Sequence, residues 1–444
     1  MKRVTVTAFL FLLIPAAGLF SPAPAQARIP VKAAVVINRA AGLLEQNRAA
    51  DAISLLKEFK QKGADASPAD ADRAGYNHPL VNLVLGNCYL AQGSKEKAIE
   101  CYRLAIEKQP ELTAAWMNLG KCYYDMGLFQ KAEDAFVKAY GTKDGKGNAL
   151  YYAAVCSMMS GSYRQALGYF DRLRKERPGE FEPSWKETLA RLYLILDMPA
   201  KALPYLEELS GTGNGSERQA WQQELVRCYA RLGMKKKAIS YVARLIEENP
   251  SEPVWWKLRA WLFILQEDYR HALADITVYG FQTGLSREEA ELAGDLSLYV
   301  GIPSSAASYY GQAANSGISP AIAAKAAQAC IRLHDFKCAS DWVSRGLENG
   351  QDRELLRIKG YLLVSDGKYR EAASVYQKIA SLSPESGEPW MMLGYCRWQQ
   401  GKTRAAAAAF RKAADCKGYN RKAMSVLREL QRFSRGHSSS SNSR

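Results

Sequence analysis

The chain has 444 residues, far more than one small hydrophobic core can organise. Hydrophobic residues make up 48% and charged residues 24%, which excludes wholesale disorder, a collagen-like chain and a protein with many membrane spans. The formal net charge of +15 comes largely from one end, because residues 397–444 hold twelve Lys or Arg against only Asp415 and Glu429. This basic segment either attracts an anionic surface or keeps the chain soluble.

The first residues have the three parts of a secretory signal. Lys2 and Arg3 precede an apolar run over residues 4–20, and Ala25-Gln26-Ala27 supplies small residues at the first and third positions before a cleavage site. The run is short for a membrane span. We expect residues 1–27 to be removed after Ala27, and the mature chain to be periplasmic or secreted. Retention of the leader as an anchor is the alternative.

A period of thirty-four residues organises the rest of the chain. The segment that starts at Asn82 reads NLVLGNCYLAQGSKEKAIECYRLAIEKQP, and the one that starts at Trp116 reads WMNLGKCYYDMGLFQKAEDAFVKA. Small residues twelve apart recur along the chain, first as Gly86 with Ala98. Small side chains allow two antiparallel helices to approach closely. The pattern therefore predicts a series of helical hairpins.

These residues resemble the tetratricopeptide repeat, whose pattern is Trp, Leu-Gly, Tyr, Ala, aromatic, Ala and Pro at fixed offsets. The resemblance implies an all-α fold, an α-α superhelix of ten to eleven hairpins with a C-terminal capping helix. The predicted organisation is a divergent hairpin over residues 28–66, a loop over 67–78, ten repeats over 79–420, a capping helix over 421–433 and a disordered Ser-rich tail over 434–444. The ten repeats start near residues 79, 113, 147, 183, 219, 253, 287, 320, 353 and 387.

Nine cysteines raise the question of a disulfide framework. Five of them occupy the tenth position of a repeat, where a small buried residue is usual, so we expect reduced, inert thiols: Cys88, Cys122, Cys156, Cys228 and Cys396. Cys330 and Cys338 lie on opposite sides of one hairpin turn. They are the candidate disulfide, with two free thiols as the alternative.

Signals for catalysis are missing from the sequence. There is no GxSxG, HExxH or Walker motif, no CxxC, and the four histidines are scattered singly. We therefore expect no enzymatic activity, no cofactor and no metal site. No nucleic-acid partner is expected.

The resemblance also implies a partner-binding groove, because positions 2, 5, 9 and 12 of each first helix line the inner face of such repeats. Trp261 is the tryptophan expected to point into this groove, whereas Trp256 is expected to pack in the core. Tyrosine, methionine and asparagine on such a surface favour peptide recognition. The candidate groove residues are Asn87, Met117, Lys121, Tyr124, Asn148, Tyr151, Met158, Arg191, Arg227 and Trp261.

Two readings of the function follow from the sequence. The favoured one is an exported, non-catalytic scaffold that binds a protein or peptide and supports a cell-envelope complex, in outer-membrane assembly, secretion, polysaccharide export or energy-coupled uptake. The alternative is an adaptor that binds glycan or cell wall through groove aromatics and the basic C-terminus. Under both readings the C-terminus can associate weakly with an anionic envelope surface.

Overall fold

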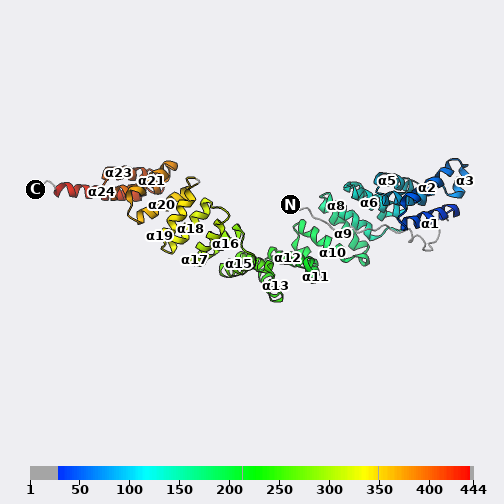
Figure 1. Ribbon diagram of the computed structural model, residues 1–444, viewed down its shortest axis with the longest axis horizontal. Helices are drawn as coiled ribbons and strands as arrows, with labels where there is room; N and C mark the ends of the chain where they lie inside the picture. Colours follow the sequence, from blue (N-terminus) through cyan, green and yellow to red (C-terminus); the bar gives the residue numbers. More distant parts are fainter. Residues whose placement is uncertain (1–28, 213, 349, 441–444) are drawn as a thin grey trace. The chain divides into compact units, whose positions relative to one another are not determined.

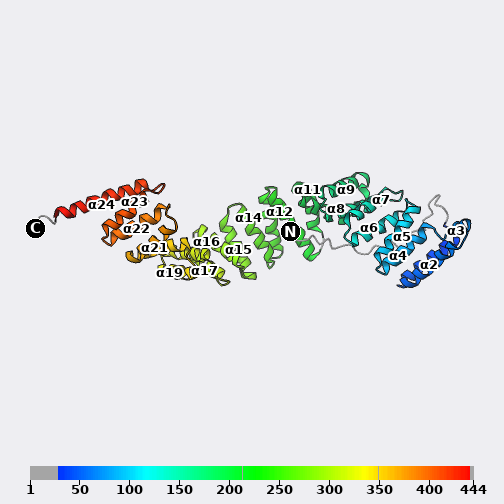
Figure 2. The same ribbon diagram turned by 90° about the horizontal axis from the view of Figure 1, so that it is seen from above.

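The computed structural model describes residues 29–212, 214–348 and 350–440, and regular structure in this part of the chain is helical (Figure 1). The leader over residues 1–27 lies outside the described residues. The chain divides into two compact units, Met1–Leu232 and Gly233–Arg444. Each unit is a run of helical hairpins that follow one another along the chain (Figure 2). The predicted all-α repeat fold is confirmed.

The first unit contains the divergent hairpin and the first four complete repeats. Its helices are α1 (Val31–Glu45), α2 (Ala49–Ala64), α3 (Pro68–Ala74), α4 (Pro79–Ala91), α5 (Lys95–Lys108), α6 (Thr113–Asp125), α7 (Phe129–Gly141), α8 (Gly147–Met159), α9 (Tyr163–Glu176), the short 3-10 helix η2 (Pro178–Glu180), α10 (Pro183–Ile195), α11 (Pro199–Gly211) and α12 (Gly215–Arg231).

The second unit begins after the turn that follows α12. Its helices are α13 (Lys235–Glu248), α14 (Pro253–Leu265), α15 (Tyr269–Thr283), α16 (Arg287–Val300), α17 (Pro303–Ala314), α18 (Pro320–Arg332), α19 (Phe336–Leu347), α20 (Arg353–Ser365), α21 (Tyr369–Leu382), α22 (Gly387–Gln399), α23 (Thr403–Ala414) and α24 (Asn420–Ser440). None of the described helices is long and apolar enough to cross a membrane.

Each hairpin is closed by a small residue on the first helix and a larger one sixteen residues later on the second. At Gly86 an added Cβ would lie 2.5 Å from the ring of Tyr102, and at Gly120 it would lie 2.8 Å from that of Phe136. The same contact occurs at Gly294, Gly360 and Gly394, where the ring belongs to Tyr310, Tyr376 and Phe410. At Ala190 the partner is the smaller Leu206, whereas Ala154 has the larger Phe170 as its partner, and all four are fully buried. The two positions therefore fill the hairpin interior together.

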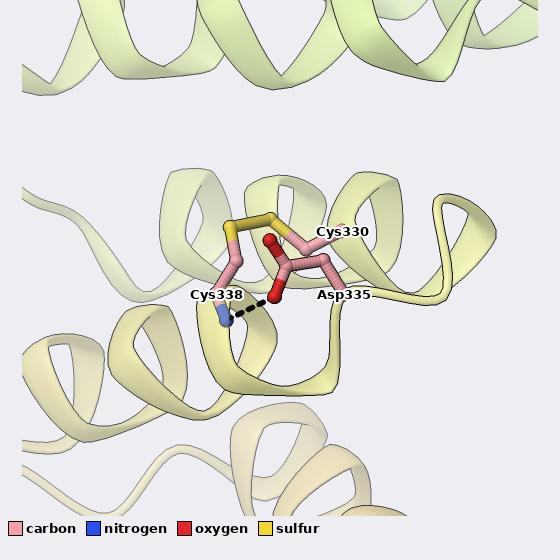
Figure 3. Close-up of a disulfide and its surroundings, with 3 residues drawn as sticks. All are labelled: Cys330, Asp335 and Cys338. Atoms are coloured by element: carbon pink, nitrogen blue, oxygen red, sulfur yellow. Dashed lines mark hydrogen bonds between the residues drawn. A yellow bond between two sulfur atoms is a disulfide. The ribbon is translucent and has the colours of Figure 1, made fainter.

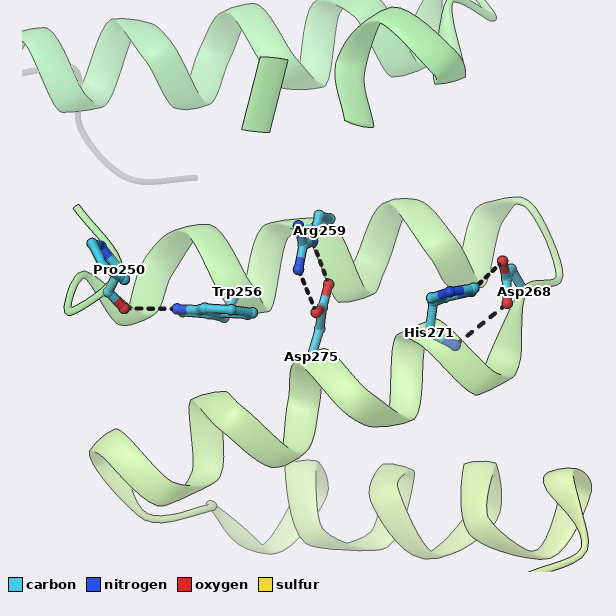
Figure 4. A network of polar contacts seen from close by, with 6 residues as sticks. All are labelled: Pro250, Trp256, Arg259, Asp268, His271 and Asp275. Atoms are coloured by element: carbon cyan, nitrogen blue, oxygen red, sulfur yellow. Dashed lines mark hydrogen bonds and ion pairs between the residues drawn. The ribbon is translucent and has the colours of Figure 1, made fainter. Parts of the chain in front are cut away.

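A tryptophan fixes the entry to several first helices. The indole N–H of Trp116 donates to the carbonyl of Pro110 at 2.8 Å, and Trp390 does the same to Pro384 at 2.9 Å. Trp256 donates to the carbonyl of Pro250 at 2.9 Å (Figure 4). The proline ends one repeat and the tryptophan begins the next, so this hydrogen bond joins neighbouring repeats. Trp256 was expected in the core, but it is only half-buried, and its neighbour Trp255 is the buried one.

Two predicted boundaries differ from the structure. The segment 67–78, predicted as a loop, contains α3, because Ser67 caps the backbone N–H of Asp70 and Pro68 occupies the first turn. The predicted capping helix over 421–433 is part of α24, which continues to Ser440, so the disorder predicted from residue 434 is wrong as far as residue 440. Residues 441–444 lie outside the described residues.

The cysteines fall into two groups. Seven are free and buried, and burial raises the pKa of the Cys88 and Cys156 thiols to about 12 and that of Cys122 to about 11. Cys330 and Cys338 form a disulfide across the turn between α18 and α19, with Cα atoms 5.8 Å apart (Figure 3). The Asp335 carboxylate accepts from the Cys338 N–H at 2.9 Å and caps α19 beside the disulfide.

Candidate partner-binding surface

The first helices of the repeats present a common stripe of side chains. We define the stripe as the fifth, ninth and thirteenth residues of each first helix, which lie on one face because they are four residues apart. First helices of adjacent repeats contact each other, as α4 and α6, α8 and α10, and α18 and α20 do. The stripes of these neighbouring repeats therefore lie side by side.

At the start of the first unit, three of the predicted groove residues are buried between helices, so this part of the prediction is wrong. Asn87, Met117 and Met158 are only 8–9% exposed. The amide oxygen of Asn87 accepts from the Tyr102 hydroxyl and from the Asn118 amide, both at 2.8 Å. These three residues hold neighbouring helices together and are not available to a partner.

The two predicted tyrosines also contribute to packing. Tyr151 stacks on Trp185 with ring centroids 5.2 Å apart, and its hydroxyl lies 3.1 Å from that of Thr188. Burial raises the pKa of Tyr151 and likewise that of Tyr124, whose ring contacts Phe129 at 5.5 Å. Tyr151 thus joins α8 to α10. Both tyrosines are half-buried and expose only part of the ring.

The remaining predicted residues of the first unit are polar and more accessible. Lys121 is partly exposed and pairs with Asp125 at 2.9 Å. Asn148 lies at the edge of an open cavity of about 720 Å³ that is also lined by Lys143, Arg177 and Trp185.

Two predicted arginines are exposed on the stripe, Arg191 at the ninth position of α10 and Arg227 at the thirteenth position of α12. Arg191 lies over the ring of Trp221, 4.4 Å from its centroid, and Arg227 pairs with Glu224 at 2.5 Å. Together they place two exposed guanidinium groups at this end of the first unit's stripe.

A row of exposed apolar residues at the turn end of the stripe was missed by the sequence analysis. Met126, Met159 and Ile195 are 38–40% exposed, although each lies on or next to a well-packed first helix. Met159 and Ile195 occupy the thirteenth position, directly before the turn. Apolar residues in that place, where turns usually carry polar ones, were the available signal.

In the second unit the stripe is more open and partly acidic. Trp261 is 39% exposed, as is Leu265 one turn further along α14. On α16, Glu291 and Asp295 occupy the fifth and ninth positions, and both contact the Lys325 ammonium of α18 at 2.8 Å. Burial tends to lower the pKa of Lys325, but its hydrogen bonds to the two carboxylates raise it overall. Tyr361 on α20 is 47% exposed.

The two helices of the hairpin that carries Trp261, α14 and α15, are joined by polar contacts (Figure 4). Arg259 on α14 donates two hydrogen bonds to the carboxylate of Asp275 on α15, at 2.7 and 2.8 Å. The Asp275 side chain is 5% exposed, so this two-point contact lies largely out of water. At the turn, the imidazole Nδ1 of His271 lies 2.7 Å from the carboxylate of Asp268. Trp261 therefore lies on a hairpin whose two helices are joined by a buried ion pair.

Among the described residues, no three His, Cys, Asp or Glu side chains are grouped closely enough to hold a metal ion. The cavity beside Asn148 is open to solvent. Fold and surface together define a helical-repeat protein that presents side chains along its first helices.

Comparison with known families identifies the repeat. Models described as tetratricopeptide repeat match residues 113–143, 148–179, 193–262 and 359–421, and one described as TPR repeat matches residues 86–127. The chain is a tetratricopeptide repeat protein, as predicted.

Curated relatives are similar over a limited part of the chain. BBSome complex member BBS4 of Bos taurus is 34% identical over 97 residues, which are 21% of this chain and 17% of the relative. The peroxisomal targeting signal receptor of Kluyveromyces lactis is 33% identical over 88 residues, which are 20% of this chain and 16% of the relative. The chain thus matches about one sixth of the length of these relatives.

Similar solved structures include repeat proteins of several kinds. The structure of Naa15/Naa10 bound to HypK-THB has 13% identity, covers 90% of this chain and 65% of that chain, and has a TM-score of 0.39. Yeast Tom70 has 13% identity, 90% and 96% coverage and a TM-score of 0.33. A tetratricopeptide repeat protein from Parabacteroides merdae has 17% identity, 58% and 97% coverage and a TM-score of 0.34.

Proposed function

We propose that this tetratricopeptide repeat protein is an exported, non-catalytic scaffold that binds a protein partner along its first helices within a cell-envelope assembly. The observation that carries the proposal is that the interior of each hairpin is packed, whereas the outer face of the first helices exposes side chains. Small residues and matched large ones fill the hairpin interior, whereas Arg191, Arg227 and Trp261 remain accessible on the first helices. Aromatic and arginine side chains are the residues that most often carry the free energy of protein binding.

The family matches support a binding role. The similar curated proteins include a targeting signal receptor and a member of a complex. A scaffold needs an accessible surface on a fixed frame, and the stripe on rigid hairpins offers one.

The cysteines support export. Disulfides persist in oxidising compartments, and Cys330 and Cys338 are joined at a turn. The seven free thiols are buried, so an oxidising environment would not readily reach them. The leader predicted over residues 1–27 supports the same location.

Export is tested by fractionation. Amino-terminal sequencing of the protein recovered from the envelope or the medium should give Arg28 as the first residue. Recovery of a chain that starts at Met1 from the cytoplasm alone would contradict export.

Binding is tested by capture from envelope extract with charge-reversed variants. The double change Arg191→Glu and Arg227→Glu alters exposed first-helix residues, and its matched control is Lys138→Glu with Arg164→Glu on the second helices α7 and α9. The proposal is supported if a protein is captured equally by the wild type and the control. The first-helix variant should capture at least about tenfold less of the same protein. Equal capture by all three would contradict binding at this end of the stripe.

Glycan or cell-wall binding is the second candidate, and the 39% exposure of Trp261 is the observation that favours it. A sugar ring would stack on the indole. Sedimentation with purified cell-wall material, compared between the wild type and Trp261→Ala, separates this candidate from protein binding. Loss of sedimentation in the variant, without any protein captured, would favour the glycan adaptor.

A further inference from the structure

The first helix α14 and the hairpin helix α15 that follows it both contact α16, the first helix of the next repeat. Near the amino ends of α14 and α16 the Lys257 ammonium forms an ion pair with Glu289. Near the turns the ring of Tyr269, the first residue of α15, packs edge-on against Tyr299 of α16 with centroids 4.2 Å apart. The stripe residues between these two contacts therefore lie side by side. They are Trp261 and Leu265 on α14 and Glu291 and Asp295 on α16.

The α16 part of this surface has an excess of negative charge. Glu291 and Asp295 share the single ammonium of Lys325. Glu288, one turn before Glu291 on the same side of α16, is exposed and has no hydrogen bond or ion pair to another described residue. Three carboxylates thus lie beside the Lys325 ammonium and the Arg287 guanidinium at the start of α16, an excess of one negative charge on a chain whose formal net charge is +15.

The α14 part of the surface is apolar and accessible. Trp261 and Leu265 are each 39% exposed and lie one helical turn apart. An indole face packs well on aliphatic side chains and also attracts a cation. An apolar site on one helix thus adjoins an anionic site on the next.

We infer that Trp261, Leu265, Glu288, Glu291 and Asp295, named here the α14–α16 face, bind an extended peptide segment in which an apolar residue and an arginine or lysine are three residues apart. The inference rests on the proposed function and specifies the chemistry of the partner. The apolar side chain packs on Trp261 and Leu265, and the cation lies among the three carboxylates.

The three-residue spacing follows from the distances between helices. Packed helices have axes about 8–10 Å apart. A segment in the polyproline II conformation advances about 9 Å in three residues and returns every third side chain to the same side. Such a segment, lying across α14 and α16, places one side chain on each helix.

The test uses the full chain and labelled peptides in fluorescence anisotropy. The probe is Leu-Pro-Ser-Arg-Ser-Pro-Leu, which offers the same spacing in either chain direction. One comparison peptide has glutamate in place of arginine, and another has alanine in place of both leucines. The arginine peptide should bind about tenfold or more tightly than either comparison peptide. Its affinity should fall as salt is raised, because the carboxylates are exposed to solvent.

Two variants locate the site. Trp261→Ala and Glu288→Lys should each weaken binding of the arginine peptide by about tenfold or more. Glu288 has no hydrogen bond or ion pair within the part of the chain that the structure describes, so Glu288→Lys tests the site even if Trp261→Ala disturbs α14. The matched controls are Phe281→Ala on α15, an aromatic residue that is 86% exposed, and Glu371→Lys on α21. Both controls should bind as the wild type does.

No binding of the arginine peptide, equal binding of the glutamate peptide, or wild-type affinity in both site variants would overturn the inference. Those results leave the proposed function standing if the Arg191 and Arg227 variant still loses its envelope partner, because that test uses residues of the first unit. If every variant still captures the envelope partner as the wild type does, the proposed function itself is contradicted.

Discussion

The close contact between Gly86 and Tyr102 makes a sharp prediction about stability. In Gly86→Ala the new Cβ would lie 2.5 Å from a ring atom of Tyr102, well inside the ordinary carbon contact distance of about 3.5–4.0 Å. The ring cannot move freely, because Tyr102 is fully buried and its hydroxyl donates to Asn87 at 2.8 Å. We therefore expect α4 and α5 to be forced apart.

The magnitude combines three effects. Overpacking costs about 1–3 kcal/mol, and weakening the Tyr102 hydrogen bond costs about 1 kcal/mol more. Alanine regains about 1 kcal/mol through its better helix propensity. The net loss in the free energy of unfolding is about 1–3 kcal/mol.

Gly168→Ala on α9 is the matched control, because an added Cβ there meets no atom within 4 Å. It should stabilise by up to about 1 kcal/mol. Tyr102→Leu in the Gly86→Ala background should restore part of the loss, since Ala190 and Leu206 make that pairing elsewhere in the chain.

The assay is urea unfolding together with hydrogen exchange of peptides from α4 and α5. Exchange should rise mainly in these helices and their neighbours, because a repeat protein distributes its stability over local interfaces. Equal stability of Gly86→Ala and Gly168→Ala would refute the reasoning about the hairpin interior.

Three further predictions concern other parts of the chain. Burial raises the pKa of Cys88, Cys122 and Cys156 to about 11–12, so iodoacetamide at pH 8 should label these thiols only after unfolding; labelling of the native chain, seen by mass spectrometry, would contradict their burial. Asp275→Asn leaves the Arg259 guanidinium without its ionised partner and should cost about 3 kcal/mol, with increased exchange confined to α14, α15 and adjacent helices; an unchanged urea midpoint would show that the pair contributes nothing. Burial lowers the pKa of His78, whose Nδ1 accepts a hydrogen bond from the Leu80 N–H. The unfolded chain therefore takes up the proton first, and the free energy of unfolding should fall as the pH drops below about 6.5. His78→Asn should remove this component from the pH profile of unfolding, and an identical profile would exclude His78 as its source.

The repeat itself could be predicted from the sequence because its signal is local. Gly86 and Ala98 are twelve residues apart within one hairpin, and both are needed for the same close approach of α4 and α5. The helix at 68–74 could also have been found, since Ser67, Pro68 and Asp70 are typical of a helix start.

The accessible surface was harder to predict because it depends on contacts between repeats. Asn87 and Met117 have the register of groove residues, but their burial is decided by how closely the neighbouring first helices approach. Tyr151 is half-buried because Trp185, which belongs to the next repeat, stacks on it. The period of a single repeat does not contain this information. Lys121 and Arg191 stay accessible at equivalent positions, so register alone does not separate the two cases.

Photocrosslinking in cells tests the central claim most directly. A benzophenone side chain is placed at Arg227 or Trp261 on first helices, and at Lys138 or Phe281 on second helices, all of which are exposed. If the first helices form the binding surface, one partner should be crosslinked from a first-helix position and not from either second-helix position. Crosslinks from second-helix positions alone, or equally from all four, would contradict the claim.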